Sequence, residues 1–156
     1  MNILYNTISR IENHLVEVSQ KLKEIPEKDL SFKRAPGKWS KKEILGHLCD
    51  SAVNNLSRFI RAQFETEPFV LNKYQQDDWV RVNHYQDMNI EDIVNFWISV
   101  NKRINYVVSK MPEEKLGIEI DHNGATYADP KGNKTLLWLF EDYLAHMEYH
   151  LKQILN

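Results

Sequence analysis

Four segments of the chain carry apolar residues at alternating three- and four-residue steps, which is the spacing of one face of an α-helix. They cover about residues 2–24, 41–63 and 90–108, and a last stretch that begins after Asn133 or Thr135 and runs to Ile154. An amphipathic helix in water gains most of its stability from covering its apolar face. The pattern therefore predicts an all-α four-helix bundle with one shared core.

Residues at the segment ends support these boundaries. Ser40 and Glu43 have the spacing of a capping box, in which each side chain bonds the other residue's backbone N–H. Asn89 is placed to cap the third helix, and Pro26 and Pro112 follow the ends of the first and third. Between the last two helices, 118–120 and 125–127 flank Asn123-Gly124 and predict a small hairpin.

Length, charge and cysteine content limit the class of protein. The 156 residues fit one domain, 1–156, and the net charge of −2 gives no basic surface for nucleic acid. A single cysteine, Cys49, allows no intrachain disulfide, and no stretch approaches the roughly 20 apolar residues of a membrane span. We expect a cytoplasmic protein that acts without nucleic acid or membrane partners.

Histidines supply the main functional signal. His146 and His150 are four residues apart in the last predicted helix, so both side chains lie on one face about 6 Å apart at Cβ. Two imidazoles at that spacing can bind one divalent metal, and His47 of the second helix could be a third ligand. Three histidine ligands leave a coordination position open, as in catalytic sites. Zinc and nickel are the metals that we expect first, although imidazole also suits copper and iron.

The long links between helices bear on their order. About 26 residues separate the second and third helices and about 23 the third and fourth, whereas antiparallel neighbours usually need two to eight. His47 lies early in its helix and His146 and His150 lie late in theirs, so an antiparallel pair brings them level most easily. If the three histidines meet, the order up-down-down-up is favoured.

Each of these signals also has a purely structural interpretation. A histidine pair at this spacing is more often two packing or half-exposed residues, and His47 could be a neutral core histidine. Asp50 and Asp142 lie one turn from His47 and His146 and could accept from their imidazoles, but exposed helix acids are as frequent.

Other residues with reactive or aromatic side chains receive structural interpretations. Cys49 points about 200° from His47 around the helix and is expected to fill the core. The remaining residues of this kind are expected to be ordinary polar residues or core and dimer anchors: His14, His84, His122, Trp39, Trp97 and Trp138. The long loop 64–89, with Asp77, Asp78, Trp79 and His84, either covers the site or is a solvated connector.

Two motifs resemble a known family. The segment from Arg34 to Ser51, followed by Arg58, resembles the Pro-x-x-Trp-Ser…His-Leu-x-Asp-Ser signature of the DinB/YfiT-like superfamily. The segment from His146 to Ile154 resembles its closing His-x-x-x-His-Leu-x-Gln-Ile. The similarity extends to 77–79, and all three histidines fall at the positions that the motifs require.

The resemblance implies a four-helix bundle of up-down-down-up order, a divalent metal on His47, His146 and His150, and a homodimer. Members include proteins assigned as metal-dependent hydrolases and enzymes that transfer low-molecular-weight thiols, such as bacillithiol transferases and a mycothiol-dependent isomerase. We therefore expect an enzyme that activates water or a thiol for attack on a small-molecule substrate. The rival hypothesis is a non-catalytic metal-binding or stress-related dimeric helical protein.

Overall fold

Four long helices dominate the computed structural model, which describes residues 2–122 and 134–156. Their bounds are Ile3–Lys23 (α1), Lys41–Arg61 (α3), Ile90–Ser109 (α5) and Leu136–Leu155 (α6). The four predicted helices are confirmed. In the described residues no helix is both long enough and apolar enough to cross a membrane.

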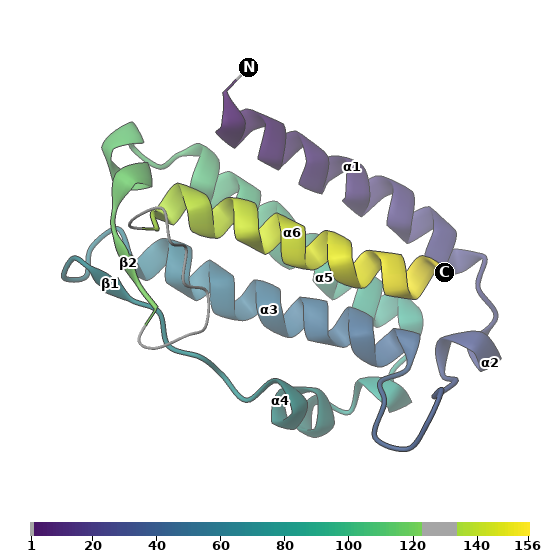
Figure 1. Cartoon of the computed structure of the whole chain (residues 1–156). Coiled ribbons are helices and arrows are strands. Elements are labelled where there is room, and N and C mark those ends of the chain that lie inside the picture. Colours follow the sequence, from purple (N-terminus) through teal and green to yellow (C-terminus); the bar gives the residue numbers. More distant parts are fainter. Residues whose placement is uncertain (1, 123–133) are drawn as a thin grey trace.

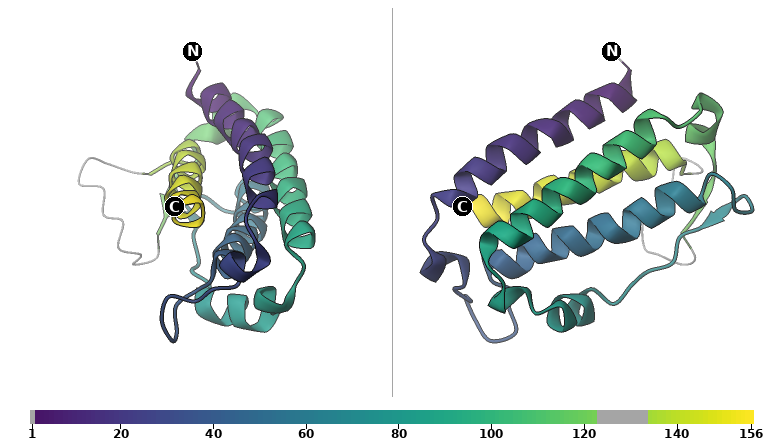
Figure 2. Two further views of the ribbon diagram at one scale, coloured as in Figure 1. Left: turned by 90° about the vertical axis from the view of Figure 1, so that its right-hand side faces the viewer. Right: turned by 180° about the vertical axis from the view of Figure 1, so that it is seen from behind.

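The long helices lie side by side as a bundle (Figures 1 and 2). α3 packs against both α5 and α6, and α1 covers the opposite side of the same two helices. Figure 1 shows α3 and α5 running in one direction and α1 and α6 running in the other. Because α3 and α5 are parallel, the link between them runs back along the length of the bundle through α4, whereas α5 ends and α6 begins at the same end of the bundle.

Side-chain caps define where the helices begin. The Oγ of Ser40 accepts from the backbone N of Glu43 at 3.2 Å, and the Glu43 carboxylate accepts from the Ser40 N at 2.8 Å, so the predicted capping box forms. Asn89 caps α5 through the N–H of Glu91, as its position predicted. Thr135 is the N-cap of α6, which decides between the two starts that the sequence allowed.

The core contains large rings from three helices. Trp97 of α5 is fully buried, and the rings of Phe59 on α3 and Phe140 on α6 meet edge to face with centroids 5.5 Å apart. Cys49 is also fully buried, as expected of a core filler, and burial raises the pKa of its thiol far above the usual range. Trp97 is therefore the core anchor that the sequence suggested.

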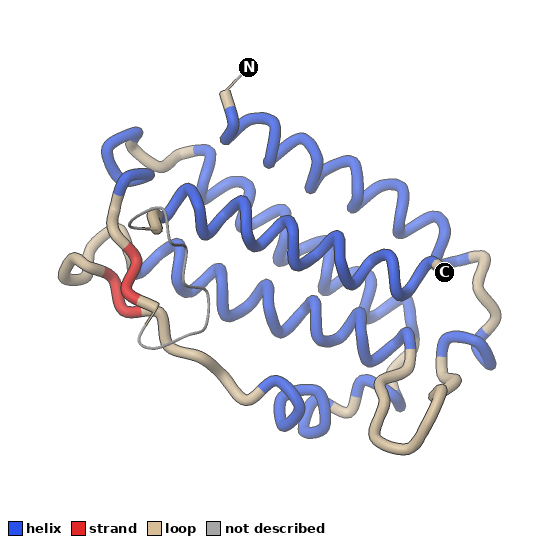
Figure 3. The backbone as a smooth tube through the Cα atoms, in the orientation of Figure 1, coloured by secondary structure: helices blue, strands red, loops and turns tan. Residues whose placement is uncertain are grey.

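Short elements fill the links (Figure 3). Besides α2 (Glu27–Leu30), they are β1 (Phe69–Val70), α4 (Gln76–Asn83), the 3-10 turns η1 (Tyr85–Asp87) and η2 (Glu113–Gly117), and β2 (Ile120–Asp121). The β2 strand pairs in parallel with β1, fifty residues earlier, a partner that local sequence cannot indicate. The second arm of the predicted hairpin, 125–127, lies outside the described residues.

A tyrosine attaches the α4–η1 segment to α3. The ring of Tyr85 lies against Gly46, and a Cβ added at Gly46 would come 2.1 Å from the Cδ2 atom of Tyr85. The Tyr85 hydroxyl donates to the Asp50 Oδ1 at 2.6 Å, and the Asn83 amide donates to the same oxygen at 3.0 Å. Because Gly46 precedes His47, this contact adjoins the histidine of α3.

The Gly46→Ala variant tests that contact. Alanine is a better helix residue by about 1 kcal/mol, but its methyl must displace the Tyr85 ring, and overpacking of this kind costs about 1–3 kcal/mol. We expect urea unfolding to show a net loss of stability. Gly117→Ala is the control, because its added Cβ meets nothing within 4 Å. Equal stability of Gly46→Ala and the parent chain would contradict the close packing.

Candidate metal centre

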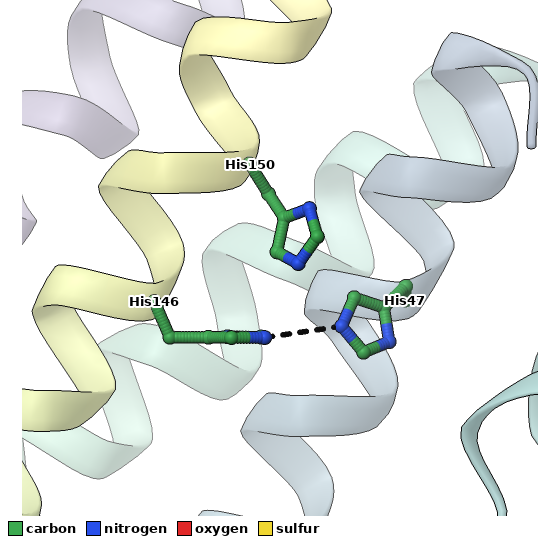
Figure 4. Close-up of side chains that lie close together, drawn as sticks. All are labelled: His47, His146 and His150. Carbon is green, nitrogen blue, oxygen red and sulfur yellow. Dashed lines mark hydrogen bonds between the residues drawn. The ribbon is translucent and has the colours of Figure 1, made fainter.

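Three histidine side chains converge between α3 and α6 (Figure 4). His47 projects from α3 and is fully buried, while His146 and His150 project from successive turns of α6 and are partly buried. One ligand-capable nitrogen from each ring lies within 4.8 Å of the others. The structure thus brings together the three histidines that the sequence singled out.

The spacing of the rings suits a single ion. The Nε2 atoms of His47 and His146 face each other at 3.2 Å. Two nitrogens bound tetrahedrally to one zinc at about 2.0–2.1 Å would be roughly 3.3 Å apart. The His150 ring completes the group, with its centroid 4.8 Å from His47 and 4.6 Å from His146. This donor set fits a divalent transition metal with little rearrangement.

Gln153 fixes the orientation of one imidazole. Its Oε1 atom lies 2.8 Å from the His150 Nδ1, and because an amide oxygen only accepts, that nitrogen carries the proton. The lone pair of His150 is then on Nε2, which is free to bind a metal. Sequence analysis missed this role, although the i, i+3 spacing of His150 and Gln153 on one helix could have indicated it.

Burial keeps the imidazoles neutral. It lowers the pKa of His47 to about 3, with further lowering from His146 and His150. Burial likewise lowers the pKa of His146 to about 4 and also lowers the pKa of His150. Neutral imidazoles are the form that binds metal, so at neutral pH no imidazolium has to be deprotonated, and the proton shared between the Nε2 atoms of His47 and His146 has only to move to an Nδ1 before an ion enters.

Trp39 forms another wall of the site. Its ring centroid lies 4.8 Å from that of His47 with the planes tilted by 34°, so the indole covers one side of the imidazole. The sequence suggested a core or dimer anchor at this position. Helical spacing cannot predict the contact between Trp39 and His47, because Trp39 lies before the start of α3 and its position depends on the conformation of the preceding loop.

The two acids considered from sequence occupy different surroundings. Asp50 is buried, and burial raises the pKa of its carboxyl to about 6. Its Oδ1 is bound by Tyr85 and Asn83, whereas its Oδ2 and the His47 Nδ1 are buried without hydrogen-bond partners in the part of the chain that the structure describes. Asp142 faces a cleft beside His146, and burial raises the pKa of that carboxyl.

A cleft of about 550 Å³ opens beside His146. Its walls come from α3, from α6 and from Leu71–Gln76, so part of the long 64–89 loop does border the site. Trp138 and His122 also line it, with ring centroids 5.2 Å apart, although sequence analysis gave them no part in the site. A second cleft of about 470 Å³ includes Trp39, Asp77 and Gln153.

The remaining candidates lie away from the histidines. His14 bonds Glu148 at 2.9 Å between α1 and α6, and His84 ends α4 in the left-handed conformation with φ of 55°. In the long loop, Asp78 pairs with Arg81 at 2.8 Å, and Trp79 packs its ring against Tyr74 at 5.4 Å between centroids. These contacts are structural.

Comparison with known families decides the relationship. The model of the DinB superfamily matches residues 10–154, nearly the whole chain. The chain belongs to the DinB superfamily. Its fold is shared with YfiT from Bacillus subtilis, described as a candidate metal-dependent hydrolase with an unusual four-helix-bundle topology. That match has a TM-score of 0.81 at 18% identity and covers 97% of this chain and 83% of YfiT.

Two further proteins resemble this chain, one in sequence and one in fold. A candidate metal-dependent hydrolase of Oceanobacillus iheyensis is 23% identical over 150 residues, which are 95% of this chain and 85% of that protein. The mycothiol-dependent maleylpyruvate isomerase superposes with a TM-score of 0.71 at 10% identity, over 97% of this chain and 60% of the isomerase. At these identities the solved structures establish the common fold alone.

The depressed histidine pKa values predict how acid affects the metal-free protein. The pKa of His47 is lower in the folded chain than in the unfolded chain. Below about pH 6.5 the unfolded chain therefore binds more protons, and the free energy of unfolding decreases as the pH is lowered. Between pH 7 and pH 5, one such histidine removes about 2 kcal/mol of unfolding free energy. Asp50, with a raised pKa, acts in the opposite direction over the same range.

The measurement is therefore a difference between two metal-free proteins. Urea unfolding at pH 7 and pH 5 should show a larger acid loss in the parent chain than in His47→Asn, because Asp50 is present in both. Equal losses in the two proteins would show that His47 is protonated as readily in the folded chain as in the unfolded chain.

Proposed function

We propose that this DinB-superfamily chain is a metal-dependent enzyme in which His47, His146 and His150 bind one divalent metal. The observation that carries the proposal is the convergence of one nitrogen from each ring within 4.8 Å beside an open cleft. A structural metal would need a closed ligand shell, whereas three protein ligands leave room for a reactant. The names of the relatives point the same way.

The proposed chemistry is nucleophilic attack on a small-molecule substrate. A divalent metal on neutral imidazoles lowers the pKa of a bound water or thiol, which gives a nucleophile at neutral pH. Water would make the protein a hydrolase, the activity in the names of two relatives. A low-molecular-weight thiol would make it an S-transferase, and the isomerase that shares the fold is mycothiol-dependent.

Residues around the histidines have supporting roles in this proposal. Gln153 orients His150 by accepting from its Nδ1 atom. Asp50 is the proposed acceptor for His47, because the Asp50 Oδ2 and the His47 Nδ1 are both buried without hydrogen-bond partners among the described residues. Asp142 faces the cleft one turn before His146, where it can hold or accept a proton close to the reacting groups. Zinc and nickel remain the metals that we expect first, and imidazole donors suit both. Dimerisation and a cytoplasmic location remain predictions.

Metal content and turnover test the proposal together. Protein purified without a histidine tag is expected to carry one metal per chain by elemental analysis, and His150→Ala is expected to lose it. His14→Ala is the matched control, because His14 contacts Glu148 outside the cluster. Metal at about a hundredfold excess over its dissociation constant should stabilise the parent chain by about 2.7 kcal/mol.

Turnover then separates the two activities. Metal-loaded protein is given bacillithiol, coenzyme A or glutathione with monochlorobimane, and in parallel a panel of esters and amides. An enzyme is supported if His150→Ala forms no product and if the parent chain loses product formation when its metal is removed and regains it when metal is added back. Bound metal with no turnover in any assay would favour the non-catalytic metal-binding protein.

Gln153 provides a test that leaves all three proposed ligands intact. Gln153→Ala removes the acceptor of the His150 N–H, and loss of such a partner lowers metal affinity about 10–100-fold. Gln153→Glu keeps an acceptor at the same place and should retain most of the affinity. Competition with a chromophoric chelator measures both. Equal affinity of Gln153→Ala and the parent chain would mean that the hydrogen bond does not support metal binding.

A further inference from the structure

The cleft beside His146 extends along α3 away from the histidines. His47, Ser51, Asn55 and Arg58 follow one another at steps of four, four and three residues, so they share one face of α3. The last three line the cleft, with Leu139 and Asp142 on the α6 side. Eleven residues from His47 to Arg58 correspond to about 16 Å of helix axis. The cleft thus has one end at the histidines and the other at Arg58.

Arg58 is held in place by uncharged groups in the part of the chain that the structure describes. One of its terminal nitrogens donates to the Asn55 Oδ1 at 3.3 Å and the other to the backbone oxygen of Asn72 at 2.5 Å. The Tyr74 ring centroid lies 6.0 Å from the guanidinium carbon. All of these partners are uncharged, and burial lowers the pKa of Arg58. The guanidinium is therefore oriented, and no acid pairs with it among residues 2–122 and 134–156.

Arg10, Arg61 and Arg81 show the alternative, a direct carboxylate partner. Arg61, one turn further along α3, pairs with Glu65 at 2.6 Å, and Arg10 pairs with Glu148 at 2.7 Å. A half-buried cation generally acquires an anionic partner, because neutral acceptors do not replace all the hydration that burial removes. Lys73 also lines the cleft. Among the described residues, the one acidic side chain that lines the cleft is Asp142, at the histidine end.

We propose that the cleft binds an elongated ligand with a carboxylate or phosphate at one end, held by Arg58, and its reactive group at the other end, beside the histidines. The planar guanidinium binds either anion through paired N–H donors. The 550 Å³ volume is within the range of small-molecule sites. Only the placement of the reactive group rests on the proposed function; anion binding by Arg58 does not require a metal.

The first experiment uses metal-free protein, so that no ion competes for the anion. Inorganic phosphate and butyrate are titrated into 15N-labelled parent chain, Arg58→Gln and Arg61→Gln, and the amide shifts of α3 and 71–76 are followed. Arg61→Gln removes the same charge from the same helix outside the cleft. We expect saturable shifts in the parent chain and Arg61→Gln, and affinity about tenfold or more weaker in Arg58→Gln. The relative affinities of the two probes tell carboxylate from phosphate.

The second experiment measures the reach from Arg58 to the metal. Cobalt-loaded protein is titrated with ω-mercaptocarboxylates of increasing chain length, and with ω-mercaptoalcohols of the same lengths, by following thiolate-to-cobalt absorption. Short chains should bind equally as acid or alcohol. Longer acids should gain about tenfold or more over the alcohols, and this gain should disappear in Arg58→Gln and persist in Arg61→Gln.

The outcomes separate the two proposals. Anion binding at Arg58 without thiolate absorption would refute a metal-bound thiol and leave the anion site intact. Thermal unfolding of each variant checks its fold, and the acid-over-alcohol comparison in the parent chain needs no variant. If no anion binds the metal-free parent chain and no acid exceeds its alcohol at any length, Arg58 only braces the 71–76 segment and the proposal is wrong.

Discussion

The convergence of three imidazoles between α3 and α6 is the constraint on which the rest of the site depends. Each ring comes from a helix whose other side is packed in the core, so its position is set by the bundle rather than by a loop. Burial lowers the pKa of His47 to about 3, and this low pKa keeps the ring neutral at pH 7. A cluster of neutral, closely spaced nitrogens has low affinity for protons and high affinity for a divalent ion.

Hydrogen bonds and ring contacts around the histidines turn a rigid scaffold into a defined geometry. Gln153 assigns the proton of His150 to Nδ1, and Trp39 covers one side of His47. Tyr85 packs on Gly46 and donates to Asp50, which joins the α4–η1 segment to the turn of α3 that carries His47. The long link between α3 and α5 therefore does more than connect two helices, because it supports one proposed ligand and lines the cleft.

Charge is distributed unevenly along that cleft. The histidine end has Asp142 and would have the charge of a metal, whereas the far end has Arg58 with neutral partners. Such an arrangement favours one orientation of a ligand with different ends, since an anionic group is stabilised at Arg58 and a nucleophile or polarised group at the histidines.

Local signals in the sequence determined the helices and indicated most of the candidate metal ligands. Apolar periodicity gave the four long helices, the Ser40–Glu43 box gave the start of α3, and the spacing of His146 and His150 placed both on one face. These features depend on residues within a few turns of each other, so neighbouring letters suffice to predict them. His47 was a candidate third ligand from its place in another predicted helix, the family motif strengthened that interpretation, and the bundle places its nitrogen beside the other two.

Tertiary structure alone decided the contacts between segments far apart in the chain. The β1–β2 pairing joins Phe69 to Ile120, Trp39 reaches His47 through a folded-back loop, and Arg58 meets Asn72 across a fold of the long link. Periodicity cannot predict such pairs, because it reports which face of an element is apolar and not which distant backbone lies against it. The histidine pair was therefore visible in the sequence, whereas the cleft and its charged end emerged only from packing.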